Sequence, residues 1–136
     1  MVKAALVGLS CVMMAIASLP VPIEEVKTAG KAVVALEYIG EAKCTAYCGC
    51  RKCNGKWYGL PTASGTDYEQ GRTIAVDPDV IPLGTEVFIK GYGWFVAEDT
   101  GYGIDGLAVD MYYDSHNEAL QHGVQYVDVW VKEGAI

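Results

Sequence analysis

Three aspartates stand at the ends of short apolar segments, where they could do acid/base chemistry together. Asp77, Asp99 and Asp110 each follow or end such a segment. A strand end holds a side chain on a rigid scaffold and directs it toward the loops that line a cleft. Three carboxyl groups meeting in one cleft resist simultaneous ionisation, so one of them keeps its proton near neutral pH. That arrangement suits cleavage of a glycosidic bond. Taken singly, each aspartate also suits a turn.

Four cysteines form a second group that could do chemistry. They fall within ten positions, at Cys44, Cys48, Cys50 and Cys53. In an exported domain, four cysteines favour two disulfides. Thiols this close in sequence can instead bind Zn²⁺ or an iron–sulfur cluster, and the Cys50-x-x-Cys53 spacing is common in metal sites. The expectation is therefore disulfides, with a bound metal or free thiols as the alternatives and no other cofactor.

The segments that must position these residues are short and punctuated. From Glu41 onward, apolar runs alternate with Gly, Pro and Asp, which is typical of an all-β domain. One short helix is expected over Ser115–His122, because Ser115 and Glu118 form a capping-box pattern and Gly123 can end the helix. The six expected strands are Ala42–Tyr47, Thr73–Val76, Glu86–Lys90, Trp94–Glu98, Leu107–Met111 and Tyr126–Val131. Six short strands and one helix predict a small barrel.

The N-terminal segment is typical of a targeting signal. Lys3 precedes the uncharged run Ala4–Ala17, whose last residues offer a small-x-small cleavage site. The run is shorter than the roughly 20 residues that a membrane span requires. Residues 1–17 are therefore predicted to be a signal peptide, with an uncleaved anchor as the alternative. Residues 18–41 are expected to form a tether and residues 42–136 the domain, in a protein that is secreted or lies in the cell envelope.

Length and charge exclude some functions. The chain has 136 residues, which predicts a single folded domain, and we expect a monomer. Its 17 acidic and 10 basic residues give a net charge of −7. No cluster of Lys and Arg is dense enough for phosphate binding, so nucleic acid is not an expected partner.

Several motifs resemble the three-aspartate (3D) domain of bacterial cell-wall proteins. They occur in the family's order as Ile74–Pro78, Ile81–Thr85, Ala97–Gly101 and Val109-Asp110. The resemblance runs from about Lys43 to Lys132. It implies a six-stranded double-psi β-barrel, the fold shared with the barrel of membrane-bound lytic transglycosylase A and with stationary-phase survival proteins.

The resemblance also implies a reaction. Asp77, Asp99 and Asp110 would be catalytic in a lytic transglycosylase that cleaves peptidoglycan between N-acetylmuramic acid and N-acetylglucosamine, with a 1,6-anhydro product. Asp110 is expected to act first as acid and then as base, with the other two orienting groups and stabilising charge. Expected substrate-binding residues are Thr62, Ser64, Thr100, Gly101, Tyr102 and His116.

Two residues of one loop depart from the family pattern, and the chain therefore has alternative predicted functions. The loop Asp99–Gly106 has Tyr102 where the family usually has Gly and Asp105 where it usually has Lys. A glycan-binding module without catalysis is therefore one alternative, and a hydrolase another. The cysteine loop Tyr47–Gly55 resembles that of a subset of the family, so a structural or metal-binding envelope protein is a third. Wall remodelling, a spore role and a phage role are all compatible with these motifs.

Overall fold

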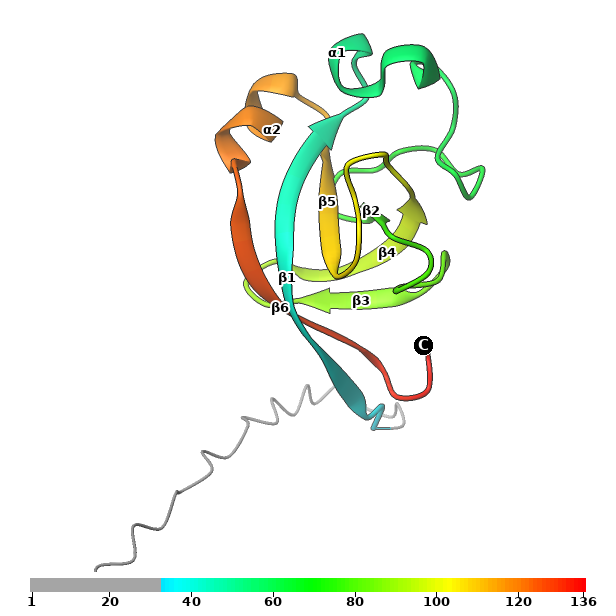
Figure 1. Ribbon diagram of the computed structural model, residues 1–136, viewed down its shortest axis with the longest axis vertical. Helices are drawn as coiled ribbons and strands as arrows, with labels where there is room; N and C mark the ends of the chain where they lie inside the picture. The colour runs from blue at the N-terminus through cyan, green and yellow to red at the C-terminus, as the bar shows by residue number, and fades with distance from the viewer. Residues whose placement is uncertain (1–32) are drawn as a thin grey trace, which may run out of the picture. The chain divides into compact units, whose positions relative to one another are not determined.

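The structure is a computed structural model that describes residues 33–136 (Figure 1). The predicted signal peptide, residues 1–17, lies outside the described residues. Within 33–136, no helix has the length and apolarity that crossing a membrane requires. The strands are β1 Leu36–Cys48, β2 Thr73–Val76, β3 Glu86–Ile89, β4 Gly93–Asp99, β5 Ala108–Tyr113 and β6 Gln125–Lys132. The helices are α1 Arg51–Asn54, α2 His116–His122 and the single 3₁₀ turn η1 Gly55–Trp57.

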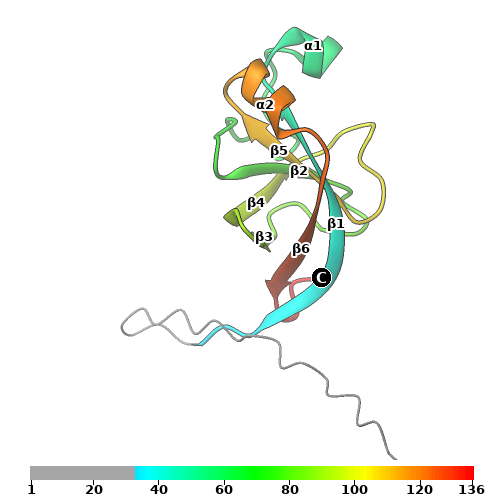
Figure 2. The ribbon, with the colours of Figure 1, turned by 90° about the vertical axis from the view of Figure 1, so that its left-hand side faces the viewer.

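The six strands pair into a closed ring. Their order is β1-β5-β2-β4-β3-β6, and β6 returns to pair with β1. The pairs β1–β5 and β2–β4 are parallel, and the other four are antiparallel. Figures 1 and 2 show α1 and α2 together at one end of this ring. The topology places β2 between β4 and β5, the two strands that carry Asp99 and Asp110.

The interior of the ring is apolar because alternate residues of each strand face it. In β6, Val127, Val129 and Val131 are buried while the residues between them are partly exposed. Val87 and Ile89 of β3 are fully buried in the same cluster. Burying each such side chain stabilises the fold by about 1.5–3 kcal/mol.

The prediction of six strands is confirmed, and β2 has the predicted bounds. Strand β1 begins at Leu36, inside the expected tether, because Leu36–Tyr38 pairs with residues 130–132 of β6. The predicted helix forms from His116, although the Ser115 side chain accepts no capping hydrogen bond. Helix α1 was not predicted, since four residues show no helical periodicity.

Candidate active site

A cleft of about 1110 Å³ lies over one face of β1, β5, β2 and β4. Its floor contains a row of four residues that are neighbours in register. Thr45 pairs with Asp110, Asp110 pairs with Ala75, and Ala75 pairs with Asp99. Cross-strand partners present their side chains on the same face of a sheet. The two carboxyl groups therefore face the cleft from either side of Ala75.

An extra residue in β4 sets this register. Ile74 pairs with Ala97, but the next residue, Ala75, pairs with Asp99, so Glu98 has no partner on β2. This is a β-bulge, which re-aims the side chains that follow it. With regular pairing, Glu98 would stand opposite Ala75 and Asp99 would face away from the cleft, because side chains alternate along a strand.

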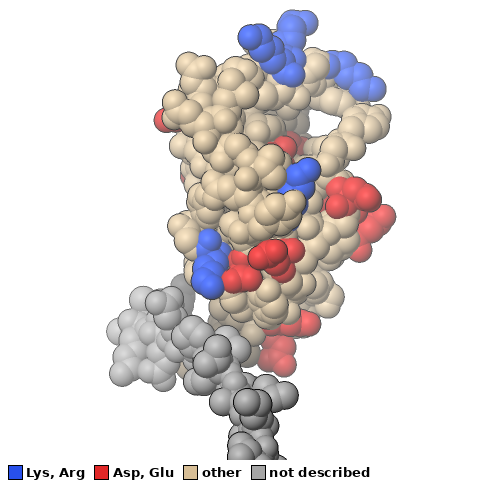
Figure 3. All heavy atoms as spheres, turned by 60° about the vertical axis from the view of Figure 1, so that its left-hand side comes forward, with Lys and Arg blue, Asp and Glu red and all other residues tan. Residues whose placement is uncertain are grey.

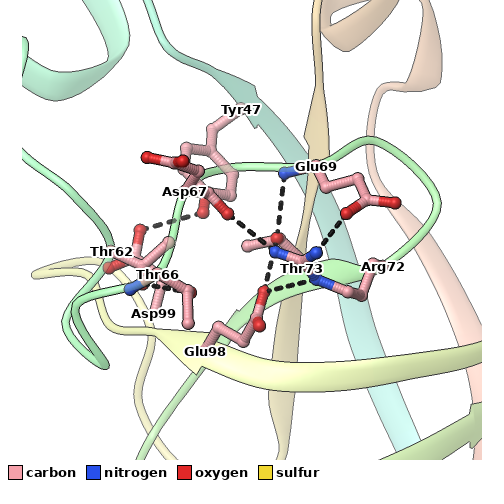
Figure 4. Close-up of polar contacts among 9 residues, drawn as sticks. All are labelled: Tyr47, Thr62, Thr66, Asp67, Glu69, Arg72, Thr73, Glu98 and Asp99. Carbon is pink, nitrogen blue, oxygen red and sulfur yellow. Dashed lines mark hydrogen bonds and ion pairs between the residues drawn. The ribbon is translucent and has the colours of Figure 1, made fainter.

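Asp99 is buried, and both of its carboxylate oxygens accept hydrogen bonds. The Tyr47 hydroxyl donates to Oδ2 over 2.9 Å (Figure 4). The backbone N–H of Ala63 donates to Oδ1 over 2.9 Å. The phenol also responds to the carboxylate, because burial and the negative charge of Asp99 raise the pKa of Tyr47. These two donors fix the position of the carboxylate on the floor of the cleft.

Asp110 is half-buried, and its Oδ1 accepts a hydrogen bond of 2.9 Å from the Thr45 hydroxyl. Burial raises the pKa of Asp110 above its ordinary value, the hydrogen bond from Thr45 lowers it, and the negative charge of Asp99 raises it. The net direction is upward. A carboxyl group with a raised pKa is suited to hold a proton and to donate it.

Asp77 has a different structural role from Asp99 and Asp110. Its Oδ2 accepts a hydrogen bond of 2.8 Å from the N–H of Gly106, and its Oδ1 accepts one of 3.0 Å from the N–H of Asp79. Asp77 is not among the residues that line the cleft, whereas Asp99 and Asp110 are. It anchors the loop 100–107, which forms a wall of the cleft, and so lies behind the site.

Four of the six expected substrate-binding residues line the cleft, namely Thr62, Thr100, Gly101 and Tyr102. Tyr102 is 93% exposed, so its ring is free to contact a ligand. Lys56 Nζ lies 5.9 Å from the centre of that ring and 4.9 Å from the centre of the Trp57 ring. Ser64 and His116 do not line the cleft. His116 instead lies beside the cysteines.

Glu98, the bulged residue, is a buried carboxylate with a structural role. Thr73 Oγ1 donates to its Oε2 over 2.6 Å, and Arg72 Nε lies 3.2 Å from the same oxygen (Figure 4). Arg72 also pairs with Glu69. These contacts join the loop before β2 to β4 and leave Glu98 outside the cleft lining.

Thr45 and Tyr47 also line the cleft, although neither was among the predicted site residues. They lie two residues apart in a strand, and that spacing places both side chains on one face. The period-two pattern was therefore an available signal for both. The N–H of Ala63 had no such signal, because it depends on how the loop 58–72 folds back.

The cysteines do not form the expected disulfides within residues 33–136, where all four are free. Cys44 lies apart from the other three, since its side chain points into the core with Sγ 3.4 Å from His122 Nε2. Burial, and then the charge of Asp110, raises the pKa of the Cys44 thiol to about 11. Cys48 is the last residue of β1, Cys50 precedes α1 and Cys53 lies within α1, and their sulfur atoms lie close together.

A second cavity, of about 530 Å³, lies between α1 and the loop 58–68. Tyr58, Tyr68 and Tyr112 are among its lining residues, and none of the three family aspartates is. The larger cleft is therefore the candidate active site, because it alone of these two combines a row of carboxyl groups with exposed aromatic rings.

Comparison with known proteins relates the chain to cell-wall proteins. It is 44% identical over 73 residues to the cell wall-binding protein YocH of Bacillus subtilis, a match covering 52% of this chain and 25% of YocH. It is 39% identical over 106 residues to YorM, a protein derived from the SPbeta prophage of the same organism, covering 75% of this chain and 44% of YorM. The chain thus spans less than half the length of the curated relatives that it matches.

Among solved structures, the crystal structure of MltA from E. coli is similar with a TM-score of 0.46 and 26% identity, over 53% of this chain and 27% of MltA. The 3D domain family matches residues 72–133, a range that contains all three aspartates. The matched range also contains the four motifs quoted above, so the resemblance to the 3D domain is confirmed.

Proposed function

We propose that this protein is a lytic transglycosylase that cleaves peptidoglycan glycan strands in the cell envelope. The observation that carries the proposal is the row Thr45–Asp110–Ala75–Asp99 on the floor of the cleft. It places a carboxyl group with a raised pKa beside a second carboxylate, in a space large enough for sugar rings. The kinship with a cell wall-binding protein supports the choice of substrate.

Asp110 acts as the general acid and then as the general base. In the first step, its carboxyl group gives a proton to the oxygen between N-acetylmuramic acid and N-acetylglucosamine, and the bond from the anomeric carbon to that oxygen breaks. In the second step, the muramic 6-hydroxyl oxygen forms a bond to the same carbon and its proton returns to Asp110. The product is a 1,6-anhydro sugar, and no water molecule is consumed.

Asp99 stabilises the positive charge that develops at the anomeric carbon between these steps. Tyr47 and the N–H of Ala63 keep its carboxylate in place, so that little reorganisation accompanies the reaction. Thr62, Thr100 and Gly101 offer polar groups along the walls, and Tyr102 offers a ring for a sugar to stack on. Asp77 positions the loop that carries Tyr102 and is a positioning residue.

The barrel's topology supports the finer description of a double-psi barrel, which we include in the proposal. Each of its two parallel pairs, β1–β5 and β2–β4, joins one of the strands β1–β3 to one of the strands β4–β6. The two strands that carry Asp99 and Asp110 both belong to the second group.

Glycan binding without cleavage is the second candidate. It is favoured by the name of YocH, a cell wall-binding protein, and by the position of Asp77 behind the cleft. In that case the cleft would hold a glycan strand through Tyr102 and the polar walls, and the carboxyl groups would serve as hydrogen-bond acceptors.

Digestion of purified sacculi separates these functions. The wild type is expected to release 1,6-anhydro muropeptides, and Asp110→Asn to lower the rate by roughly 10²–10⁴-fold, the usual contribution of a general acid. Asp105→Asn is the matched control, because Asp105 is an exposed carboxylate of the neighbouring loop 100–107 and does not line the cleft. It should retain the wild-type rate. New reducing ends would indicate a hydrolase, and sedimentation with sacculi without products would indicate a binding module.

A further inference from the structure

A cluster of four metal-ligating side chains lies outside the cleft floor. The ligand atoms of Cys48, Cys50, Cys53 and His116 all lie within 4.8 Å of one another. His116 Nδ1 is 3.5 Å from the sulfur of each of the three cysteines. The sulfur atoms of Cys48 and Cys53 are 3.6 Å apart. A nitrogen at the same distance from three sulfurs is what four ligand atoms at the corners of a tetrahedron produce.

These distances match a tetrahedral zinc site. Zn–S bonds of about 2.3 Å and a Zn–N bond of about 2.0 Å separate the sulfurs of a regular tetrahedron by about 3.8 Å and place the nitrogen about 3.5 Å from each sulfur. A disulfide would join two of the sulfurs and would leave no reason for His116 to lie equally close to all three. Three sulfurs with one imidazole nitrogen is also a ligand set that zinc favours over harder cations.

The local fold holds the ligands in place. The N–H groups of Cys53 and Asn54 donate to the carbonyl of Cys50 over 3.2 and 3.0 Å, which closes the turn between two of the cysteines. Asn54 Nδ2 donates to the carbonyl of Cys48 over 2.8 Å and ties the third cysteine to the same turn. His116 is the first residue of α2, so its ring reaches this turn from a different part of the chain.

The charges around the cluster suit three thiolates. Three thiolates, one neutral imidazole and Zn²⁺ carry a net charge of −1. Basic side chains gather at the end of the barrel that carries α1 (Figure 3), and those of the short helices are Arg51, Lys52 and Lys56. Their positive charge favours an anionic centre at this end.

We propose that Cys48, Cys50, Cys53 and His116 bind one Zn²⁺ in a closed structural site. Four protein ligands complete a tetrahedron and leave no position for a substrate, which is the pattern of structural sites and not of catalytic ones. The ion ties the segment 48–53 to the start of α2. Because residues Lys52–Trp57 line the cleft, the ion also fixes one of its walls.

Metal analysis of the full-length protein tests the site. The protein is purified through a tag without histidine and without chelators, and zinc is measured by plasma mass spectrometry. One zinc ion per chain is expected for the wild type and for Cys44→Ala, the control at a cysteine outside the cluster. Cys53→Ser and His116→Ala should lose the ion, whereas His116→Cys should retain it because a thiolate replaces the imidazole.

Replacement of the zinc by Co²⁺ should give the charge-transfer and visible absorption bands of a tetrahedral thiolate site. A wild-type chain without bound metal whose mass is about 2 Da low for each bridge would show disulfides and overturn the proposal, as would full zinc content in both Cys53→Ser and His116→Ala.

The structural role has its own readout, which does not depend on catalysis. Removing the ion with a chelator should speed amide hydrogen exchange in residues 49–61 and leave exchange in β3 unchanged. Unchanged exchange in 49–61 after the metal has left would overturn the role in the cleft wall. Asp110→Asn should keep its zinc, so failure of the metal site and failure of the proposed enzyme are separate results.

Discussion

Asp99 and Asp110 are both register partners of Ala75, one on the strand to each side of it. The methyl group of Ala75 therefore lies between the two carboxyl groups, and the cleft opens above it. The negative charge of Asp99 acts on Asp110 across this gap.

The pKa of Asp110 should respond to its two neighbours in opposite directions. Thr45→Val removes the hydrogen bond that lowers the pKa, so the pKa should rise. Asp99→Asn removes the negative charge that raises it, so the pKa should fall. The measurement is an NMR titration of the Asp110 carboxyl carbon. A pKa that stays the same in both variants would contradict the electrostatic account.

The free energy of unfolding should also depend on the ionisation of Asp110. The pKa of Asp110 is raised above its ordinary 3.8, so the folded protein holds this proton at pH values where the unfolded chain has released it. This contribution to the free energy of unfolding is fully present below pH 3.8, and it is lost as the pH rises through the raised pKa of Asp110. Asp110→Asn should lack this fall in the free energy of unfolding, which urea denaturation at several pH values can measure.

Enlarging Ala75 should close the cleft floor. Ala75→Leu places a branched side chain between the carboxyl groups, so binding to sacculi should be lost. Overpacking costs about 1–3 kcal/mol of stability, and the melting temperature is therefore measured alongside. Ala75→Ser nearly keeps the original volume and should retain binding, as should Ala135→Leu at the exposed C-terminus. Wild-type binding by a folded Ala75→Leu protein would show that the glycan does not reach this floor.

Asp77 should control the loop 100–107 and not the proton transfer. Asp77→Ala removes two acceptors, which should lower the free energy of unfolding by about 1–3 kcal/mol and speed exchange of the Gly106 amide. Asp79→Ala is the control, because that side chain is exposed and the N–H of residue 79 remains. If exchange at Gly106 is the same in Asp77→Ala as in the wild type, the anchoring role is wrong.

The hydroxyl of Tyr47 should matter for stability as well as for the site. Tyr47→Phe leaves Oδ2 of the buried Asp99 without this donor, so the free energy of unfolding should fall by about 1–3 kcal/mol. Tyr58→Phe changes an exposed tyrosine in the same way and should have little effect. Equal urea midpoints for the two variants would contradict the prediction.

Much of the fold was accessible from the sequence because its signals are local. Alternating apolar residues such as Val127, Val129 and Val131 mark a strand whichever partners it has. The α2 segment could be located from Glu118 and Gly123, even though Ser115 makes no side-chain cap. The four-residue helix α1 is too short to leave a periodic pattern, and the cysteines in and around it indicated a loop.

The site was less accessible, because it depends on contacts between distant segments. Nothing local in β4 shows that Glu98 is an extra residue, yet that bulge decides that Asp99 faces the cleft. Asp77 has the same sequence context as the other aspartates, and only its bond to Gly106 separates its role from theirs. His116 could not be joined to the cysteines without knowing that α2 begins beside the end of β1.

The partners of β1 have a consequence for how the ring is assembled. The first strand pairs only with β5 and β6, which end at residues 113 and 132. Contacts between such distant segments require closure of long loops, which slows folding. Residues 33–107 by themselves therefore leave both edges of β1 unpaired, and the ring closes only once β5 and β6 have joined it.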